Sequence, residues 1–384
     1  MISTILLVVF YLFTPLLILY SCQKLSILRR IGAIIIAYGV GLVAGVTGLL
    51  PENSIEVQNI ITTITIPLAI PLMLFSSNIK AWTRLAGSTV ISMIIALIAV
   101  IISVIGGFLL FMGDDVKELW KVGGLLVGVY TGGTPNLAAL KIMLNVDNDT
   151  YILTHAYDMI IGAVYFFFLI TVGQKLFNFV LPKFKPGLGN KDESVLNDMS
   201  AVPMWGLGKK ENRMPMLKGL GLSVAIFGIA GLTTLFTPEN SQMIVVVLLI
   251  TTLGILFSLS PAVNKLNNTF ELGMYLILVF SIDVASMVDV TNIVNASPTI
   301  FYYVLIVIFG SLFLQVLLST IFKIDTDTVI ITSTALICSP PFVPAVAGAI
   351  KNKEIIVSGL TIGIIGYAVG NYLGVLIAEF LHTF

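Results

Sequence analysis

Residues 125–140 read Leu-Leu-Val-Gly-Val-Tyr-Thr-Gly-Gly-Thr-Pro-Asn-Leu-Ala-Ala-Leu, an apolar stretch that is interrupted at its centre. The Gly-Gly pair weakens a helix, and the proline that follows lacks a backbone donor and clashes with the preceding turn. Thr134 suits the N-cap of a new helix, and Pro135 suits its first turn. The stretch therefore predicts that the apolar segment 118–145 is a helix broken in its middle.

The segment 328–350 carries a second break, which reads Cys-Ser-Pro-Pro-Phe at residues 338–342. Ser339 before Pro340 offers the same cap-then-proline start. Unwound backbone at membrane depth is costly unless it is buried in protein or faces a wet cavity, and the N-terminus of a half-helix favours an anion. Paired breaks of this kind indicate a transporter site, whereas ordinary proline kinks in packed helices are the alternative. We expect the substrate to be bound at the two breaks by Thr131, Gly132, Gly133, Thr134, Pro135, Asn136, Cys338, Ser339, Pro340, Pro341 and Phe342.

The composition around these breaks is that of a membrane protein. Of the 384 residues, 57% are hydrophobic and 10% are charged, and the mean hydropathy is +1.04. A soluble protein carries about 25% charged residues. The lipid bilayer is therefore the expected partner, and a soluble enzyme, a nucleic-acid binder and a disulfide-stabilised secreted domain are excluded. The sequence lacks the common motifs of hydrolases, metalloproteases and nucleotide-binding enzymes, so we expect neither enzyme activity nor a cofactor.

Long apolar runs divide the chain into membrane segments and one linker. We count twelve segments, at 4–21, 31–49, 58–78, 88–112, 118–145, 150–180, 217–237, 240–259, 269–288, 299–322, 328–350 and 355–380. The stretch 182–215 holds ten of the 40 charged residues and four prolines, which makes it the one clear linker. It separates a first membrane repeat, 1–181, from a second, 216–384.

Three short matches indicate that the second half repeats the first. At offsets of 205, 206 and 204 positions, the matched stretches are 70–79 with 275–284, 134–135 with 340–341, and 160–162 with 364–366. A nearly constant offset is the sequence sign of an internal duplication.

The positions of Lys and Arg indicate how the two halves are oriented. If all twelve segments cross the membrane, the better orientation places 12 of the 20 basic residues inside. If 118–145 and 328–350 instead enter and leave on the same side, 17 of the 20 lie inside, with both termini outside and the linker 182–215 cytoplasmic. Each half then crosses five times, which is an inverted-topology repeat. We predict an all-α polytopic protein of a bacterial inner membrane, built from two inverted repeats with broken or re-entrant helices.

Asp158 is the charged residue that lies deepest in a predicted segment, about 12 Å from its start at helical rise. His155 precedes it by three positions and shares its helix face. A carboxylate at this depth is costly unless it faces a polar interior, and an acid beside an imidazole can bind Na⁺ or carry a proton. We expect this pair to bind the coupling ion, with a Na⁺ site near Asp158; a structural hydrogen bond between helices is the alternative.

Four further polar residues are weaker candidates for the site. Asn78 and its repeat counterpart Asp283 fall near segment ends, where they can reach solvent or the interface. Thr361 and Asn371 lie within the last segment, where they could line a cavity or bond to a neighbouring helix.

The Thr-Gly-Gly-Thr-Pro-Asn stretch at 131–136, with Ser-Pro-Pro-Phe at 339–342, resembles the YjcL-like family of uncharacterised bacterial integral membrane proteins (domain of unknown function 819). The resemblance covers essentially the whole chain. The family is similar to the superfamily of cation/proton antiporters and anion transporters, which implies an elevator-type transporter with a scaffold, a mobile core and a homodimeric assembly. Gly132 and Gly133 match the Gly-Gly re-entrant tips of citrate-type carriers, whereas Pro340-Pro341 departs from that pattern.

Three functions are consistent with these patterns. The first is a secondary active transporter of a small organic anion, coupled to Na⁺ or H⁺. The second is a cation/proton antiporter without an organic substrate, in which Asp158 exchanges H⁺ for Na⁺. A channel or sensor is disfavoured, because no potassium-channel filter sequence and no ligand-binding domain are present.

Overall fold

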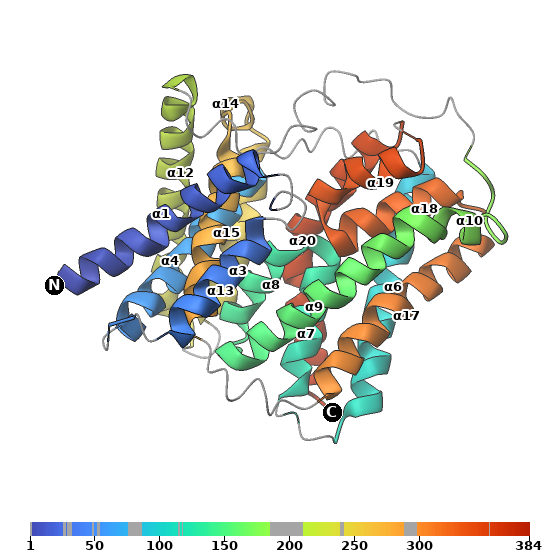
Figure 1. Ribbon diagram of the computed structural model, residues 1–384, viewed down its shortest axis with the longest axis horizontal. Coiled ribbons are helices and arrows are strands. Elements are labelled where there is room, and N and C mark those ends of the chain that lie inside the picture. The colour runs from blue at the N-terminus through green and yellow to red at the C-terminus, as the bar shows by residue number, and fades with distance from the viewer. Residues whose placement is uncertain are drawn as a thin grey trace. The chain divides into compact units, whose positions relative to one another are not determined.

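The computed structural model of the chain describes residues 2–25, 28, 33–47, 50–51, 54–75, 87–113, 116, 118–184, 210–238, 242–287, 298–352 and 354–384. Within these residues all regular structure is helical (Figure 1). Eight of the described helices are long and apolar enough to cross a membrane. The prediction of an all-α polytopic membrane protein is therefore confirmed.

Each of the twelve predicted segments contains helix, although some boundaries differ. Helix α4 (Ser54–Phe75), for example, begins four residues before its predicted start. Glu56 in its first turn ended the apolar run, but an acidic side chain is favourable at that end of a helix dipole.

The chain forms two compact units, and each unit is built from both halves of the sequence. Unit 1 comprises Met1–Ser77, Val146–Leu153 and Met204–Ala296. Unit 2 comprises Asn78–Asn145, Thr154–Pro203 and Ser297–Phe384. The division of the sequence into repeats 1–181 and 216–384, joined by the linker 182–215, stays a prediction.

Helix α15 is the centre of unit 1, where it packs against α1, α3, α4 and α12. The helices of this unit are α1 (Ile2–Lys24), α3 (Ala33–Val46), α4, η2 (Lys210–Asn212), α12 (Arg213–Leu232), η3 (Thr233–Phe236), α13 (Gln242–Ser258), α14 (Pro261–Asn264) and α15 (Thr269–Ser286). Gly41 and Gly45 let α3 approach α15 closely. A Cβ atom on Gly41 would lie 2.2 Å from the Ile282 backbone oxygen, and one on Gly45 would lie 2.5 Å from the Ser286 backbone oxygen. Small residues four positions apart are a common means of close helix packing in membranes.

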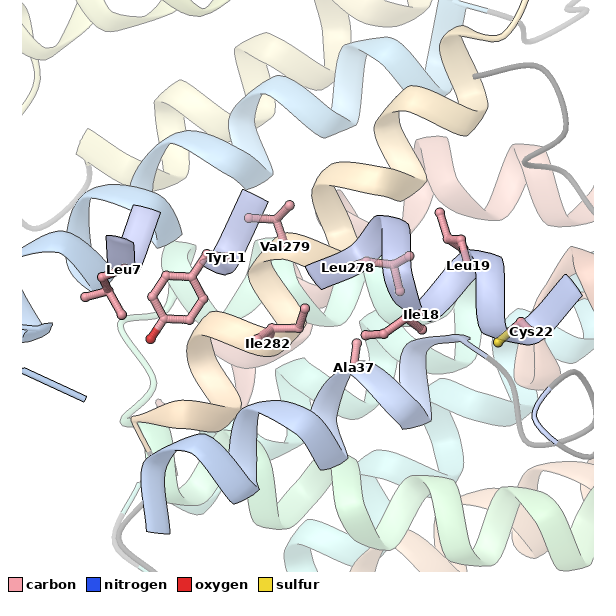
Figure 2. Packing of buried hydrophobic residues seen from close by; sticks show 9 residues of the cluster. All are labelled: Leu7, Tyr11, Ile18, Leu19, Cys22, Ala37, Leu278, Val279 and Ile282. Carbon is pink, nitrogen blue, oxygen red and sulfur yellow. The ribbon is translucent and has the colours of Figure 1, made fainter. Parts of the chain in front are cut away.

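An apolar cluster joins three helices of unit 1 (Figure 2). Its buried members are Leu7, Tyr11, Ile18, Leu19 and Cys22 from α1, Ala37 from α3, and Leu278, Val279 and Ile282 from α15. Figure 2 shows Ile18 and Ala37 beside each other, facing α15. In a bilayer such contacts hold helices together through close packing, since the lipid is as apolar as the side chains.

In unit 2, α20 packs along α7, and α17 packs along α6. The helices of this unit are α6 (Gly87–Phe111), α7 (Leu119–Gly132), α8 (Thr134–Met143), α9 (Asn148–Phe168, from Thr154 on), the π-helix η1 (Leu169–Gly173), α10 (Gln174–Phe177), α17 (Thr299–Ile321), α18 (Thr326–Ser333), the π-helix η5 (Thr334–Cys338), the 3₁₀ helix η6 (Pro340–Phe342), α19 (Val343–Ala349) and α20 (Ile356–Leu381). The two broken segments both belong to this unit.

The first broken segment folds back on itself. We call it hairpin 1; it consists of α7, Gly133 and α8. Its two ends meet, because Lys121 Nζ near the start of α7 donates to the Asn145 carbonyl just after α8 at 3.1 Å. Lys121 also pairs with Glu118 at 2.8 Å.

The second broken segment folds back in the same way. We call it hairpin 2; it consists of α18, η5, Ser339, η6 and α19. Asn352, just after α19, donates to Asp327 Oδ2 in the first turn of α18 at 2.9 Å, and Gln174 donates to Oδ1 at 2.8 Å. Both broken segments thus return to where they began. That each enters and leaves the membrane on the same side stays a prediction.

Candidate functional site

The tips of the two hairpins meet within unit 2. Gly133, at the tip of hairpin 1, has φ +78° and ψ −165°, a conformation that favours glycine. A Cβ atom on Gly133 would lie 2.1 Å from the Ser339 Oγ at the tip of hairpin 2. Two residues separated by about 200 positions in sequence are therefore in contact at the two breaks.

The structure corrects the predicted cap at the first break and places Ser339 at the N-cap of the second. Gly133, and not Thr134, is the N-cap of α8, and no side chain caps this helix. The reason is that the chain turns at residue 133 through a backbone conformation that glycine adopts most easily, so α8 begins one residue before the predicted start. Ser339 precedes η6 but makes no capping hydrogen bond. Its φ of +85° is strained for a residue with a side chain, and its hydroxyl lies against Gly133.

Three glycines of α20 press against the two tips. A Cβ atom would lie 2.2 Å from Pro340 Cγ at Gly363, 1.8 Å from the Thr131 oxygen at Gly366, and 2.0 Å from Asn136 Nδ2 at Gly370. The backbone of α20 therefore touches hairpin 1 and hairpin 2 directly. A helix with larger residues at these positions would be pushed away from the breaks.

Most polar groups at the tip of hairpin 1 make hydrogen bonds within the protein. Asn136 Nδ2 donates to the Gly366 carbonyl at 3.1 Å, and Thr131 Oγ1 donates to the Val127 carbonyl at 2.8 Å. The Gly133 carbonyl accepts from the backbone N–H groups of Asn136 and Leu137. Asn136 and Thr131 are both buried.

The residues that remain accessible at the tips are fewer than the sequence suggested. Gly132, Gly133, Pro135 and Pro340 are buried along with Thr131 and Asn136. Thr134, Cys338 and Ser339 are half-buried. Phe342 is 44% exposed, and its ring packs edge-on against Phe166 at 5.3 Å between centroids. Pro341 lies in η6.

Asp158 lies beside both hairpins. Its Oδ2 is 3.4 Å from His155 Nδ1, so the predicted acid–imidazole pair is in contact. Its carboxylate is also close enough to act electrostatically on Tyr130, at the end of α7, and on Cys338, at the end of η5. The side chains of His155 and Asp158 are 3% and 14% exposed. Sequence periodicity could place His155 and Asp158 on one face, but it could not show that they adjoin the two breaks.

The whole chain matches a known family. Residues 8–384 match the model described as a protein of unknown function, DUF819. The chain belongs to this family. It is also similar to the uncharacterized membrane protein YjcL of Bacillus subtilis (strain 168), with 25% identity over 374 residues that cover 94% of this chain and 93% of YjcL. The family resemblance is thereby confirmed, and the DUF819 chain is a multi-pass membrane protein.

Two tyrosines near the candidate site of this DUF819 chain could not be recognised from the sequence. Tyr130 is fully buried in the last turn of α7 and looked like one apolar residue among many. Tyr165 is fully buried on α9, and its hydroxyl bonds to Ser333 on α18, which ties Asp158's helix to hairpin 2. The one available signal was that Tyr165 follows Asp158 by seven positions and so lies on the same helix face.

The three weaker candidates that the structure describes are all buried. Asp283 belongs to unit 1 and has an exposure of 0%, so its side chain does not reach solvent, which was one of the two environments that its position near a segment end allowed. The reason is that Thr62 of α4 donates to its Oδ2 at 2.8 Å inside the helix bundle. Thr361 is buried and donates to the Val357 carbonyl of its own helix, and Asn371 is buried on α20. Asn78 lies outside the described residues.

Proposed function

We propose that this DUF819 protein is a secondary active transporter of a small organic anion, coupled to Na⁺ or H⁺. The observation that carries the proposal is the contact between two helical hairpins, Gly133 against Ser339, with the acid–imidazole pair of Asp158 and His155 beside it. Irregular backbone at membrane depth is tolerated where it lines a binding site. Transporters place substrate and coupling ions at broken helices of this kind.

The tips offer a suitable environment for an anion. Helix α8 begins at the contact point, so the positive end of its dipole lies there. Half-buried Thr134 and Ser339 add hydroxyl donors, and half-buried Cys338 lies next to Ser339. A carboxylate of the substrate would bind to these groups, and Asp158 would hold the coupling ion.

The internal packing supports an inverted repeat. Each compact unit takes segments from both halves of the chain. Helix α4 packs against α15, and α6 packs against α17, and these are repeat partners at the offset found in the sequence. We propose that the protein belongs to the superfamily of cation/proton antiporters and anion transporters. In an elevator mechanism, unit 2 would be the mobile core and unit 1 the scaffold of a homodimer in a bacterial inner membrane.

A thermal-shift screen of the purified protein tests the proposal. Small carboxylates are added in NaCl or in choline chloride of equal ionic strength, at pH 6 and pH 8. We expect one carboxylate to raise the melting temperature more when the coupling cation is present, because a ligand that binds only the folded state stabilises it. Asp158→Asn should abolish the cation dependence, and Asp149→Asn in the first turn of the same helix should preserve it.

Two results would count against this function. Full retention of the cation dependence in Asp158→Asn would remove Asp158 from the coupling site. Cation-dependent proton release by the purified protein without any carboxylate response would instead favour the cation/proton antiporter.

A further inference from the structure

Tyr130 carries a buried hydroxyl that makes no well-formed hydrogen bond to another part of the fold. Its side chain has an exposure of 0%, three residues before the tip of hairpin 1. Within the described part of the chain, this hydroxyl makes no hydrogen bond of normal length and angle; its interaction with the Asp158 carboxylate is at most a weak one. A buried polar group left without a partner loses its hydration with nothing in return. Such a group in a folded protein requires an explanation, of which a bound ion or water is a common one.

The groups around this hydroxyl come from three parts of unit 2. The Asp158 carboxylate of α9 is close enough to act on Tyr130, and so is the Cys338 thiol of η5. His155 Nδ1 lies 3.4 Å from Asp158 Oδ2 on the same helix. These are the titratable groups that the described residues bring to Asp158: one from its own helix, one from hairpin 1 and one from hairpin 2.

Tyr165 shows what the ordinary arrangement looks like. It is equally buried, lies two helical turns beyond Asp158, and its hydroxyl is bonded to Ser333. Tyr130 and Tyr165 therefore differ in one respect that matters here. The Tyr165 hydroxyl makes a hydrogen bond to Ser333, whereas the Tyr130 hydroxyl has only a weak interaction with the Asp158 carboxylate.

We propose that Tyr130 Oη and the Asp158 carboxylate together bind the coupling cation, so that the cation joins α9 to the tip of hairpin 1. This inference rests on the proposed function and adds Tyr130 to it. A phenol oxygen and a carboxylate are hard ligands that suit Na⁺, and a protonated Asp158 would donate to the same phenol oxygen. Thiols prefer soft metals, so Cys338 is not a ligand.

The arrangement explains how cation binding would affect the substrate. Tyr130 is separated from Gly133 by one helical turn, and Gly133 touches Ser339 across the tips. A cation held by Tyr130 would fix the last turn of α7, and with it the position of both tips. An empty cation site would leave that turn held by packing alone.

The test compares Tyr130→Phe with Tyr165→Phe as the matched control. Melting temperatures of the purified proteins are measured across a NaCl series at constant ionic strength with choline chloride, and across pH 5 to 9 without Na⁺. We expect the wild type to be stabilised either by Na⁺ in the NaCl series or by H⁺ in the pH series. Tyr130→Phe should need at least about tenfold more of that cation, because a hydrogen bond or ligand to a charged group is lost. Tyr165→Phe should melt at a lower temperature yet keep the wild-type cation response.

The possible results separate this inference from the proposed function. A wild-type cation response in Tyr130→Phe, together with its loss in Asp158→Asn, would overturn the role of Tyr130 and leave the transporter proposal intact. A wild type that responds to neither arm would overturn both. Should Tyr130→Phe fail to fold, Tyr130→Met, which also lacks the oxygen and adapts to the space, is judged by the same criteria.

Discussion

Replacing Gly366 by alanine tests the contact between α20 and the tip of hairpin 1. A Cβ atom there would lie 1.8 Å from the Thr131 carbonyl oxygen, whereas ordinary contacts begin at 3.4 Å, so the helices must separate by about 1.6 Å (3.4 − 1.8). The obstructing atom is backbone and cannot rotate away. Overpacking of this kind costs about 1–3 kcal/mol. The shift would also stretch the 3.1 Å bond from Asn136 to the Gly366 carbonyl, at about 1 kcal/mol.

One term opposes these losses. Alanine is favoured over glycine in a helix by about 1 kcal/mol, so the net destabilisation should be about 1–3 kcal/mol. Gly106→Ala in α6 is the matched control, because nothing lies within 4 Å of its added Cβ. We expect purified Gly366→Ala to melt below the wild type and Gly106→Ala at or above it. A Gly366→Ala protein as stable as the wild type would refute the close contact between α20 and hairpin 1.

Three further predictions concern hydrogen-bonded clusters and topology. Gln58→Leu should destabilise the protein by about 1–3 kcal/mol in thermal unfolding, because Gln58 donates to both Tyr11 and Ser286 inside unit 1; Thr63→Val, which loses a bond only to its own helix, should be nearly neutral. Asp327→Ala should destabilise the protein by a similar free energy and so lower its melting temperature, because two amide donors at the base of hairpin 2 lose their acceptor; an unchanged melting temperature would show that the base is held by packing. A cysteine placed within 182–215 of a cysteine-free variant should react with a membrane-impermeant maleimide only from the cytoplasmic side, as the distribution of Lys and Arg predicts.

The helices and the two breaks could be predicted from the sequence because their signals are local. A run of apolar residues requires a helix in lipid, and Gly-Gly-Thr-Pro or Ser-Pro-Pro interrupts it wherever the rest of the chain lies. The contact between His155 and Asp158 is also local, since three positions on a helix define a shared face.

The remaining features depend on contacts between distant parts of the chain. Nothing in the local sequence shows that Gly133 meets Ser339, or that α20 supplies glycines for both tips. Tyr130 could not be separated from other buried aromatic residues, because its importance comes from Asp158 on another helix. The burial of Asp283 could not be predicted for the same reason, because it is due to side chains of α4 and not to its position along α15.

The closed bases of the hairpins have a consequence for the path of a solute. The arms of hairpin 1 are in direct contact, since a Cβ atom on Gly128 would lie 2.1 Å from Leu140 Cδ1 and one on Gly124 would lie 2.7 Å from Leu144 Cδ1. The Lys121 hydrogen bond joins the two arms at the base of this hairpin, and the glycines of α20 pack against its tip, so the arms are in contact along the hairpin. If the protein transports a solute as proposed, the solute would pass around hairpin 1 and not between its two arms.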